Sequence, residues 1–305
     1  MMTKKSLILL AALALTFTGC SNEEAVEPSS YVAEGTPIKV NATVEELTGE
    51  LTTKNDVTSD ELTEFWLQIK HTSDKFTYYA YMRFDKTAQT WNSYTDNTCD
   101  EELKMYWAGD NTDVLVTAAS FDFKKNVVNP TLPDFANHQS DETNCKKNDW
   151  LIMNTGSRKQ SDDGVIDVTL RHLMATLTVT INLGTGVTSD VNPLTDVKIS
   201  GIYCKCPLAA AEIGGYKWGS VDTDSELDIT PFCTSYTKSD GTTSAKATYK
   251  AFIIPQNVTA GSLDFSLTYG GKSYIYTYSP DSDYEFVINT PYTITLNMPT
   301  AAAGE

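Results

Sequence analysis

The stretch MATLTVTINL, residues 174–183, alternates apolar and polar side chains. The alternation places Leu177, Val179 and Ile181 on one face, which is the pattern of a half-buried β-strand. Similar stretches, rich in β-branched and aromatic residues and bounded by Asp, Asn, Gly or Lys, recur along the chain. The sequence therefore predicts an all-β fold, with further strands at residues 38–44, 65–71, 76–84, 103–107, 114–121, 150–156, 165–172, 197–203, 249–255, 263–270, 273–279, 284–290 and 292–298.

The spacing of these strands predicts two domains. Many short strands separated by turns indicate sandwiches or barrels, and the GGKS stretch at 270–273 is typical of a hairpin turn. A short helix is expected only around residues 208–213. Because one sandwich takes about 100 residues, we expect two, joined at the polar stretch 157–164. The predicted domains are residues 36–160 and 161–299, with a tail at 300–305.

The N-terminus has the features of a secretion signal. Lys4 and Lys5 precede the apolar run LILLAALALTF (7–17), which is followed by small residues before Cys20. This run is shorter than the roughly 20 apolar residues that a membrane-spanning helix needs. We therefore expect residues 1–19 to be removed from the mature chain.

The surroundings of Cys20 resemble the lipobox of bacterial lipoproteins, in which this cysteine becomes the first mature residue and carries a diacylglycerol. Gly19 fits the small position before the cysteine, whereas Phe17 stands where Leu is usual. The resemblance implies a lipid anchor at Cys20, because each buried CH₂ of an acyl chain contributes ~0.8 kcal/mol to membrane binding. A plain signal peptide that ends near a cysteine is the alternative.

Residues 20–35 are polar and acidic and are predicted to form a tether. Its first residues resemble the surface-export signal of Bacteroidetes lipoproteins: Ser21, Asn22, Glu23 and Glu24. The resemblance implies a lipoprotein exposed at the surface of the outer membrane. In the alternative interpretation, Glu23 and Glu24 only solvate the tether.

The composition limits the partners that this chain can have. It carries 40 acidic against 23 basic residues, with a formal net charge of −17 at pH 7. Such a surface repels nucleic acid and anionic lipid, so neither is an expected partner. The three arginines are Arg83, Arg158 and Arg171, and this scarcity argues against a phosphate-recognition surface.

The sequence carries no recognisable catalytic or metal motif. No glycine loop, G-x-S-x-G or H-E-x-x-H occurs, and the three histidines, His71, His138 and His172, lie far apart along the chain. Two alternating acidic triplets lack the glycine and the terminal Glu of a calcium loop, and we expect solvated turns there: Asp222, Asp224 and Glu226, and Asp281, Asp283 and Glu285. We therefore expect no enzyme activity, no metal and no cofactor.

The other cysteines leave their pairing open, and their odd number leaves one thiol over. Cys204 and Cys206 are expected to point to one face of a strand. With Cys233 they supply three thiolates, whereas a structural zinc site needs four ligands. Buried thiols or one disulfide are expected among Cys99, Cys145, Cys204, Cys206 and Cys233.

Three stretches, in this order, resemble the fimbrillin family of Bacteroidales cell-surface proteins. They are WNSYTDNTCDEELKMYW (91–107) leading into VLVTAASF (114–121), LRHLMATLTVTI (170–181) and AFIIPQNVTAGSLDFSLTYGGKSYIYTY (251–278). The resemblance covers residues 36–298. It implies two tandem transthyretin-like Greek-key β-sandwiches, in proteins that form fimbriae or that anchor and cap them.

The resemblance also implies a mechanism of assembly. In polymerising members a trypsin-like protease cuts after an Arg behind the first strand, that strand leaves, and a strand of the next subunit fills the groove. Here the strand to be displaced carries Ile38, Val40, Ala42 and Val44. The loop at 47–62 contains no Arg, and the best match to the cut position is Lys54, which is alternatively a solvated loop lysine.

These observations predict a structural subunit of a cell-surface fimbria. The missing Arg and the short tail favour an anchor, tip or accessory subunit over a stalk subunit. The expected partners are other fimbrial subunits, the outer membrane through the lipid, and host or bacterial surface ligands. The alternative is a glycan-binding lipoprotein, because FTYYAYMRF (76–84) and SYIYTYS (273–279) carry tyrosines two apart, although core packing also explains them.

Overall fold

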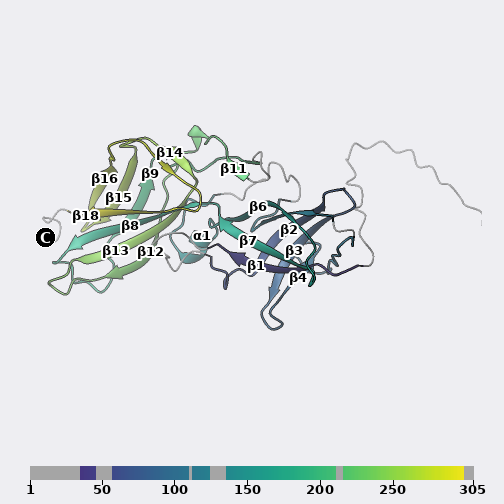
Figure 1. Cartoon of the computed structure of the whole chain (residues 1–305). Coiled ribbons are helices and arrows are strands. Elements are labelled where there is room, and N and C mark those ends of the chain that lie inside the picture. Colours follow the sequence, from purple (N-terminus) through teal and green to yellow (C-terminus); the bar gives the residue numbers. More distant parts are fainter. Residues whose placement is uncertain (1–34, 46–56, 110–111, 124–134, 211–215, 299–305) are drawn as a thin grey trace, which may run out of the picture.

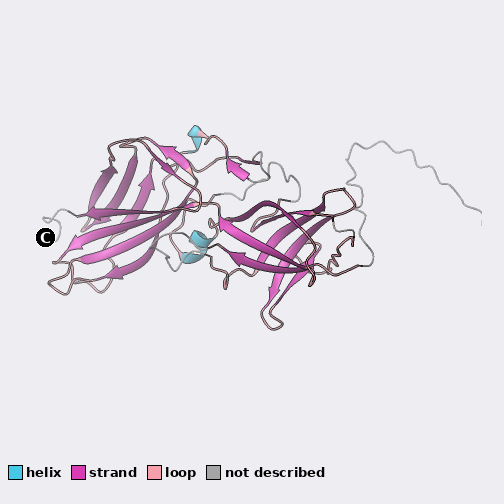
Figure 2. Ribbon diagram, viewed as in Figure 1, coloured by secondary structure: helices cyan, strands magenta, loops and turns pink. Residues whose placement is uncertain are grey.

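The computed structural model describes residues 35–45, 57–109, 112–123, 135–210 and 216–298. Strands dominate these ranges, and they form two lobes that lie end to end (Figures 1 and 2). The helices of the described ranges are α1, Glu142–Lys146, and a single 3₁₀ turn at Thr223–Ser225. The all-β fold predicted from the sequence is confirmed.

The first domain is built on a seven-stranded sheet with the order β1-β7-β6-β5-β2-β3-β4. All pairs are antiparallel except β1 with β7, which is parallel. The strands are β1 Lys39–Val44, β2 Glu64–His71, β3 Thr77–Asp85, β4 Thr90–Tyr94, β5 Val114–Ala119, β6 Leu151–Arg158 and β7 Val165–His172.

This sheet is strongly bent, so that β1 comes back toward β4. The register of β7 with β6 is limited to two pairs, Leu151 with His172 and Ile152 with Arg171. The apolar side chains of β1 and β7 therefore share one core with those of β2, β3, β5 and β6, and Phe65 at its centre is 0% exposed. Residues 103–107, expected as a strand, instead make isolated backbone contacts to β1 and β4.

The second domain packs a four-stranded sheet, β12-β13-β8-β18, against a three-stranded sheet, β16-β15-β9 (Figure 1). Two small antiparallel pairs, β10-β11 and β14-β17, complete it. The strands are β8 Ala175–Gly184, β9 Thr195–Ser200, β10 Leu208–Ala210, β11 Tyr216–Trp218, β12 Phe232–Thr237, β13 Ala245–Ile253, β14 Gln256–Val258, β15 Leu263–Tyr269, β16 Lys272–Tyr278, β17 Tyr284–Phe286 and β18 Pro291–Asn297.

The alternation that opened the sequence analysis reappears in β8. Leu177, Val179 and Ile181 are at most 2% exposed and lie in the core of the second domain. The predicted hairpin is also confirmed, because β15 and β16 pair as far as Tyr269 with Lys272. Gly270 and Gly271 have φ of 57° and 74°, which side chains other than glycine rarely adopt.

The predicted join at 157–164 does not separate the two sheets. It includes the end of β6 and the turn to β7, and β7 pairs with β1 inside the first sheet. A Cβ on Gly164 would lie 2.7 Å from the Pro37 carbonyl oxygen, so this turn packs tightly on the chain before β1. The division at residues 160 and 161 thus cuts one sheet, and the chain passes to the second sheet through Leu173 and Met174.

The prediction of a helix around residues 208–213 is wrong for its first three residues, because Leu208–Ala210 forms the strand β10. Residues 211–215 lie outside the described ranges. The α-helix that is present, α1, begins after Asp141, whose carboxylate accepts a hydrogen bond from the Asn144 backbone N–H. This is an ordinary N-cap and stabilises a helix by about 1 kcal/mol. The sequence analysis missed it because five residues give no periodic signal.

A segment of the first domain crosses to the second and supplies a missing strand partner. Gln139 is fully buried; its side-chain N–H donates to the Phe252 carbonyl (3.0 Å), and its side-chain oxygen accepts from the Phe252 N–H (2.8 Å). Phe252 lies beyond the stretch that β12 pairs with, so the Gln139 amide takes the place of a strand. Backbone bonds between Gln139 and Thr230 and between Thr230 and Asn137 run alongside.

The two domains also share an apolar cluster at this junction. It joins Trp66, Phe121 and Trp150 of the first domain with residues of the second, among them Phe252 and Ile254. Each of these five side chains is at most 8% exposed. Burial on this scale holds the two sheets against each other.

We predict that Gln139→Ala destabilises the protein by about 2–4 kcal/mol, since it leaves two buried backbone groups of Phe252 without partners at about 1–3 kcal/mol each. Gln139→Glu is expected to cost more, because a carboxylate cannot donate to the Phe252 carbonyl. Denaturant unfolding measures both. The control is Gln160→Ala in the half-exposed β6–β7 turn, expected within about 0.5 kcal/mol of wild type. Equal stability of Gln139→Ala and this control would contradict the assignment.

Candidate strand-exchange site

The first strand lies at the edge of its sheet and pairs with β7 alone. Its register runs from Lys39 opposite Val165 to Val44 opposite Leu170. Its polar residues are exposed, and its apolar residues face the core in strict alternation. Ile38 and Val44 are 8% and 7% exposed, and the half-buried Val40 and Ala42 pack against the same cluster.

Few other contacts hold β1. At its start, the Ile38 N–H donates to the Met105 carbonyl, and the Trp107 N–H donates to the Thr36 carbonyl, both at 2.9 Å. At its end, the Glu45 N–H donates to the Leu170 carbonyl at 2.7 Å. Removing β1 would therefore break one ladder and these flanking bonds.

Its removal would also open the core of the first domain along β7. Fully burying an Ile or Val side chain stabilises a fold by roughly 1.5–3 kcal/mol, so the inward residues of β1 together contribute several kcal/mol. The backbone of β7 would lose its partner over residues 165–170, since β6 pairs only with its last two residues. An unpaired ladder beside an open apolar groove is a template for another strand.

The two ends of the stretch that follows β1 lie close together. The Ser59 hydroxyl accepts from the Val44 N–H at 2.9 Å and lies 3.3 Å from the Val44 carbonyl oxygen. Residues 46–56, which include Lys54, lie outside the described ranges. Val44 and Ser59, on the two sides of this stretch, are therefore in direct contact.

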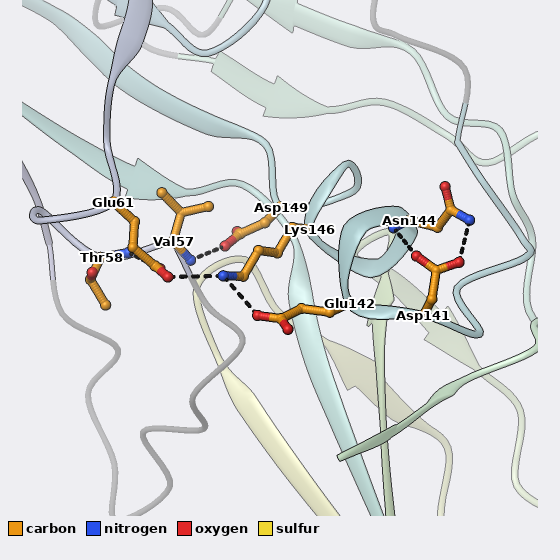
Figure 3. A network of polar contacts seen from close by, with 8 residues as sticks. All are labelled: Val57, Thr58, Glu61, Asp141, Glu142, Asn144, Lys146 and Asp149. Atoms are coloured by element: carbon orange, nitrogen blue, oxygen red, sulfur yellow. Dashed lines mark hydrogen bonds and ion pairs between the residues drawn. The ribbon is translucent and has the colours of Figure 1, made fainter. Parts of the chain in front are cut away.

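A polar clamp fixes the returning chain to the body (Figure 3). The Val57 N–H donates to the Asp149 carboxylate at 2.8 Å, and the Lys146 ammonium lies 2.9 Å from Glu61 and 3.1 Å from Glu142. Lys146 lies in the last turn of α1, so this short helix positions the ammonium group for both contacts. We call these contacts the α1 clamp.

Asp149 connects the α1 clamp to the domain junction. Its second carboxylate oxygen lies 2.6 Å from Nδ1 of His172, the last residue of β7. Both side chains are at most 3% exposed. The interpretation of His172 as structural agrees with this burial. The chain on the two sides of residues 46–56 is therefore held differently: β1 by a strand ladder, and residues 57–61 by side chains around α1.

The electrostatics of the clamp favour its charged form. The hydrogen bond from Lys146 holds the pKa of the Glu61 carboxyl below its usual value of 4.5, and the same contact raises the pKa of Lys146. Both side chains remain partly exposed, at 42% for Glu61 and 26% for Lys146. Water therefore screens the pair, and its contribution is that of a surface ion pair.

The structure brings together part of the predicted site. The inward-facing residues of the first strand lie on one face as expected: Ile38, Val40, Ala42 and Val44. The lipidation and export residues, Cys20 and Ser21, Asn22, Glu23 and Glu24, lie outside the described ranges. Sequence reasoning missed Lys146 and Asp149, which are far from their partners along the chain and belong to no motif.

The five cysteines that the structure describes are free thiols. Cys204 lies in the core of the second domain and Cys206 in the junction cluster, so they do not share a face of one strand. Burial raises the pKa of the Cys204 thiol to about 11 and also raises that of Cys206. Thiols with such raised pKa values are poor nucleophiles and poor metal ligands near neutral pH.

The acidic triplets serve as turn residues. Asp222 caps the 3₁₀ turn by accepting from the Asp224 N–H at 3.0 Å. Asp283 accepts from the Ala260 N–H at 2.9 Å. Among the residues that the structure describes, no group of three or more His, Cys, Asp or Glu side chains could hold a metal ion.

The tyrosine stripes face the protein interior. Tyr274, Tyr276 and Tyr278 share one face of β16 and pack half-buried against the core of the second domain. Tyr78 is fully buried in the core of the first domain, and Tyr81 is 7% exposed in the junction cluster. Core packing therefore accounts for the stripes.

The fold and the edge strand describe a protein made of two tandem β-domains whose first strand completes a core. The family model for fimbrillin-like proteins matches residues 52–304, and the chain belongs to this family. A comparison with curated proteins finds no match.

Two solved structures share the fold. A candidate cell adhesion protein from Bacteroides uniformis is 15% identical with a TM-score of 0.54, over 87% of this chain and 94% of that one. A second, from Bacteroides ovatus, is 12% identical with a TM-score of 0.53, over 86% and 92%. None of the helices described here is long and apolar enough to cross a bilayer.

We predict that the contribution of Glu61 depends on pH. Its pKa is lowered on folding, so its stabilisation is present above the usual value of 4.5 and is lost as the pH falls through the lowered value. Glu61→Gln should cost about 0.5 kcal/mol at pH 7, the range of exposed ion pairs, and close to nothing at pH 2. Urea unfolding at the two pH values measures this.

The matched control is the same substitution in a Lys146→Met background. There Glu61 has lost its ammonium partner and keeps only the exposed hydrogen bond from the Thr58 N–H, so Glu61→Gln should have a smaller effect at pH 7 than in the wild-type background. An undiminished effect of Glu61→Gln in that background would contradict the pairing.

Proposed function

We propose that this chain is a structural subunit of a cell-surface fimbria that assembles by β-strand complementation. The observation that carries the proposal is β1, an edge strand at the start of the fold whose inward side chains complete the first core. Membership of the fimbrillin-like family supports it. The candidate cell adhesion proteins that share the fold agree with a place at the cell surface.

In the proposed exchange, a strand of another subunit takes the position of β1 beside β7. A strand from another subunit that runs along β7 would restore the backbone ladder and refill the positions of Ile38, Val40, Ala42 and Val44. The incoming strand therefore needs small or β-branched apolar residues at alternate positions. Until it arrives, the groove remains open.

We further propose that a cut at Lys54 starts the exchange. After such a cut, residues 36–54 would be held by β1 alone, whereas the new N-terminal segment would stay on the body through the α1 clamp. A protease specific for Arg would not cut here, because the loop contains no Arg. This departure favours an anchor, tip or accessory position, with a stalk position next.

The proposed attachment to the cell is a lipid on Cys20. The sequence before it has the form of a lipoprotein signal, and Ser21, Asn22, Glu23 and Glu24 follow as an export signal. Diacylglycerol together with a further acyl chain such as palmitate gives stable membrane attachment. The protein would then be a surface-exposed outer-membrane lipoprotein with no enzymatic role.

We predict that trypsin cleavage at Lys54 makes β1 exchangeable. A labelled peptide of residues 36–45, TPIKVNATVE, should bind the cut protein and co-elute with it in gel filtration. The same peptide with Val40→Asp and Ala42→Asp should not bind, because it would bury two charges in the groove. Lys54→Gln protein treated alike should also fail to bind.

Assembly separates the possible roles. Cut stalk subunits should form ladders that resist SDS, and the free peptide should suppress them. Cut anchor subunits should take up the peptide without forming ladders. Cut protein that neither binds the peptide nor forms ladders would overturn strand complementation.

We predict that Cys20→Ser removes the protein from the membrane fraction and abolishes labelling by a palmitate analogue, because position 20 then has no sulfur to carry the diacylglycerol. Serine is nearly the size of cysteine, so the fold should not change. Cys99→Ser serves as the control and should label like wild type. Membrane-bound, labelled Cys20→Ser protein would contradict the lipid anchor.

A further inference from the structure

A hollow of about 610 Å³ opens where the two domains meet, and none of its lining residues belongs to β1. It lies between Arg171 at the end of β7, the chain from Trp218 to Thr223, and the residues around β14 and β17. Ligand pockets occur preferentially at domain interfaces and enclose about 300–1,000 Å³. We propose that this junction hollow binds a neutral hexopyranose unit of a glycan.

The wall of the junction hollow is a fixed aromatic ring. Trp218 is half-buried, and its indole N–H donates to the Leu173 carbonyl at 3.1 Å. Its ring lies 6.2 Å from that of Trp150 in the junction cluster. Val287, 40% exposed, and the half-buried Ile288 extend the apolar wall. A ring held in this way offers a surface on which the C–H face of a pyranose can stack.

Two polar residues of the small β14-β17 ladder also line the hollow. Asn257 on β14 and Glu285 on β17 stand directly opposite each other in the ladder, and both are exposed. Opposite residues have Cβ atoms roughly 4.5–5.5 Å apart, so an amide donor and a carboxylate acceptor lie side by side. Such a pair suits two adjacent sugar hydroxyls.

The backbone beneath this pair is fixed. The buried Gln256 uses its side-chain oxygen to accept from the Tyr203 N–H at 3.0 Å. Its side-chain nitrogen donates to the carbonyls of Tyr203 and Ile254 at 3.0 and 2.9 Å. β14 is therefore held rigidly against the second domain, which keeps Asn257 in place for a ligand.

The negative charge of the chain and of Glu285 in the hollow favours a neutral sugar as the ligand. The chain has a net charge of −17, and Glu285 adds a carboxylate to the rim, so both disfavour an anionic ligand. Arg171, at the end of β7, also lines the hollow. This site differs from the aromatic stripes considered from the sequence, because it uses Trp218 and the loops around it. It stands independently of strand exchange.

Titration of the purified mature chain tests the proposal, with tryptophan fluorescence and calorimetry as readouts. The probes are maltohexaose, cellohexaose, laminarihexaose and mannohexaose, with hexagalacturonate as the anionic comparison. At least one neutral probe should bind and quench fluorescence. Asn257→Ala and Glu285→Gln, both at exposed positions, should each weaken that binding at least tenfold, and Trp218→Ala should abolish the quenching.

Tyr274→Ala on β16 is the control and should leave the affinity unchanged. The proposal is overturned if none of the neutral probes binds, if hexagalacturonate binds more tightly than all of them, or if the Asn257 and Glu285 variants bind like wild type. The same variants should take up the β1 peptide normally after cleavage at Lys54. Failure of strand exchange would therefore leave this result intact.

Discussion

The structure depends on the two-residue connection from β7 through Leu173 and Met174 into β8. The strand before it belongs to the sheet of the first domain and the strand after it to that of the second. Each of these two strands also carries a parallel edge strand, β1 beside β7 and β18 beside β8. Because Leu173 and Met174 are fully buried, the link between the domains is itself part of a core. The two domains are therefore joined by a short buried connection rather than by an exposed linker.

Buried polar groups secure this junction as much as apolar contacts do. Gln139 satisfies both backbone groups of Phe252, and Asp149 accepts from Val57 while it contacts His172. Such groups are costly to bury without partners, so the native arrangement is favoured over looser packings. Segments far apart in the sequence thus meet at one place, between α1 and the end of β7. Residues 57–61 and the domain junction are therefore physically connected there.

The sequence reveals the parts of this structure that repeat locally. Alternation predicted the strands and even the inward face of β1, and the pair Gly270–Gly271 predicted a hairpin. The domain division failed because the charged stretch 157–164 resembles a linker but forms a hairpin turn, whereas the actual crossing at Leu173 is apolar. The α1 clamp joins residues with no local pattern between them. A single sequence contains no signal for such contacts.

The comparison of the two parallel edge strands shows why β1 is the better candidate for exchange. Parallel strands need a long connection between them, so neither β1 nor β18 is tied to its partner by a hairpin turn. However, β18 is secured near its start by Tyr292, whose hydroxyl donates to the Glu285 carbonyl at 2.7 Å and accepts from the Val287 N–H at 2.8 Å. By contrast, β1 has the exposed side-chain contact of Asn41 with Asp167 and the Ser59 contact at its end. In the proposed exchange, β1 would lose its ladder and the few backbone bonds that flank it, whereas β18 would also have to lose the Tyr292 side-chain bonds.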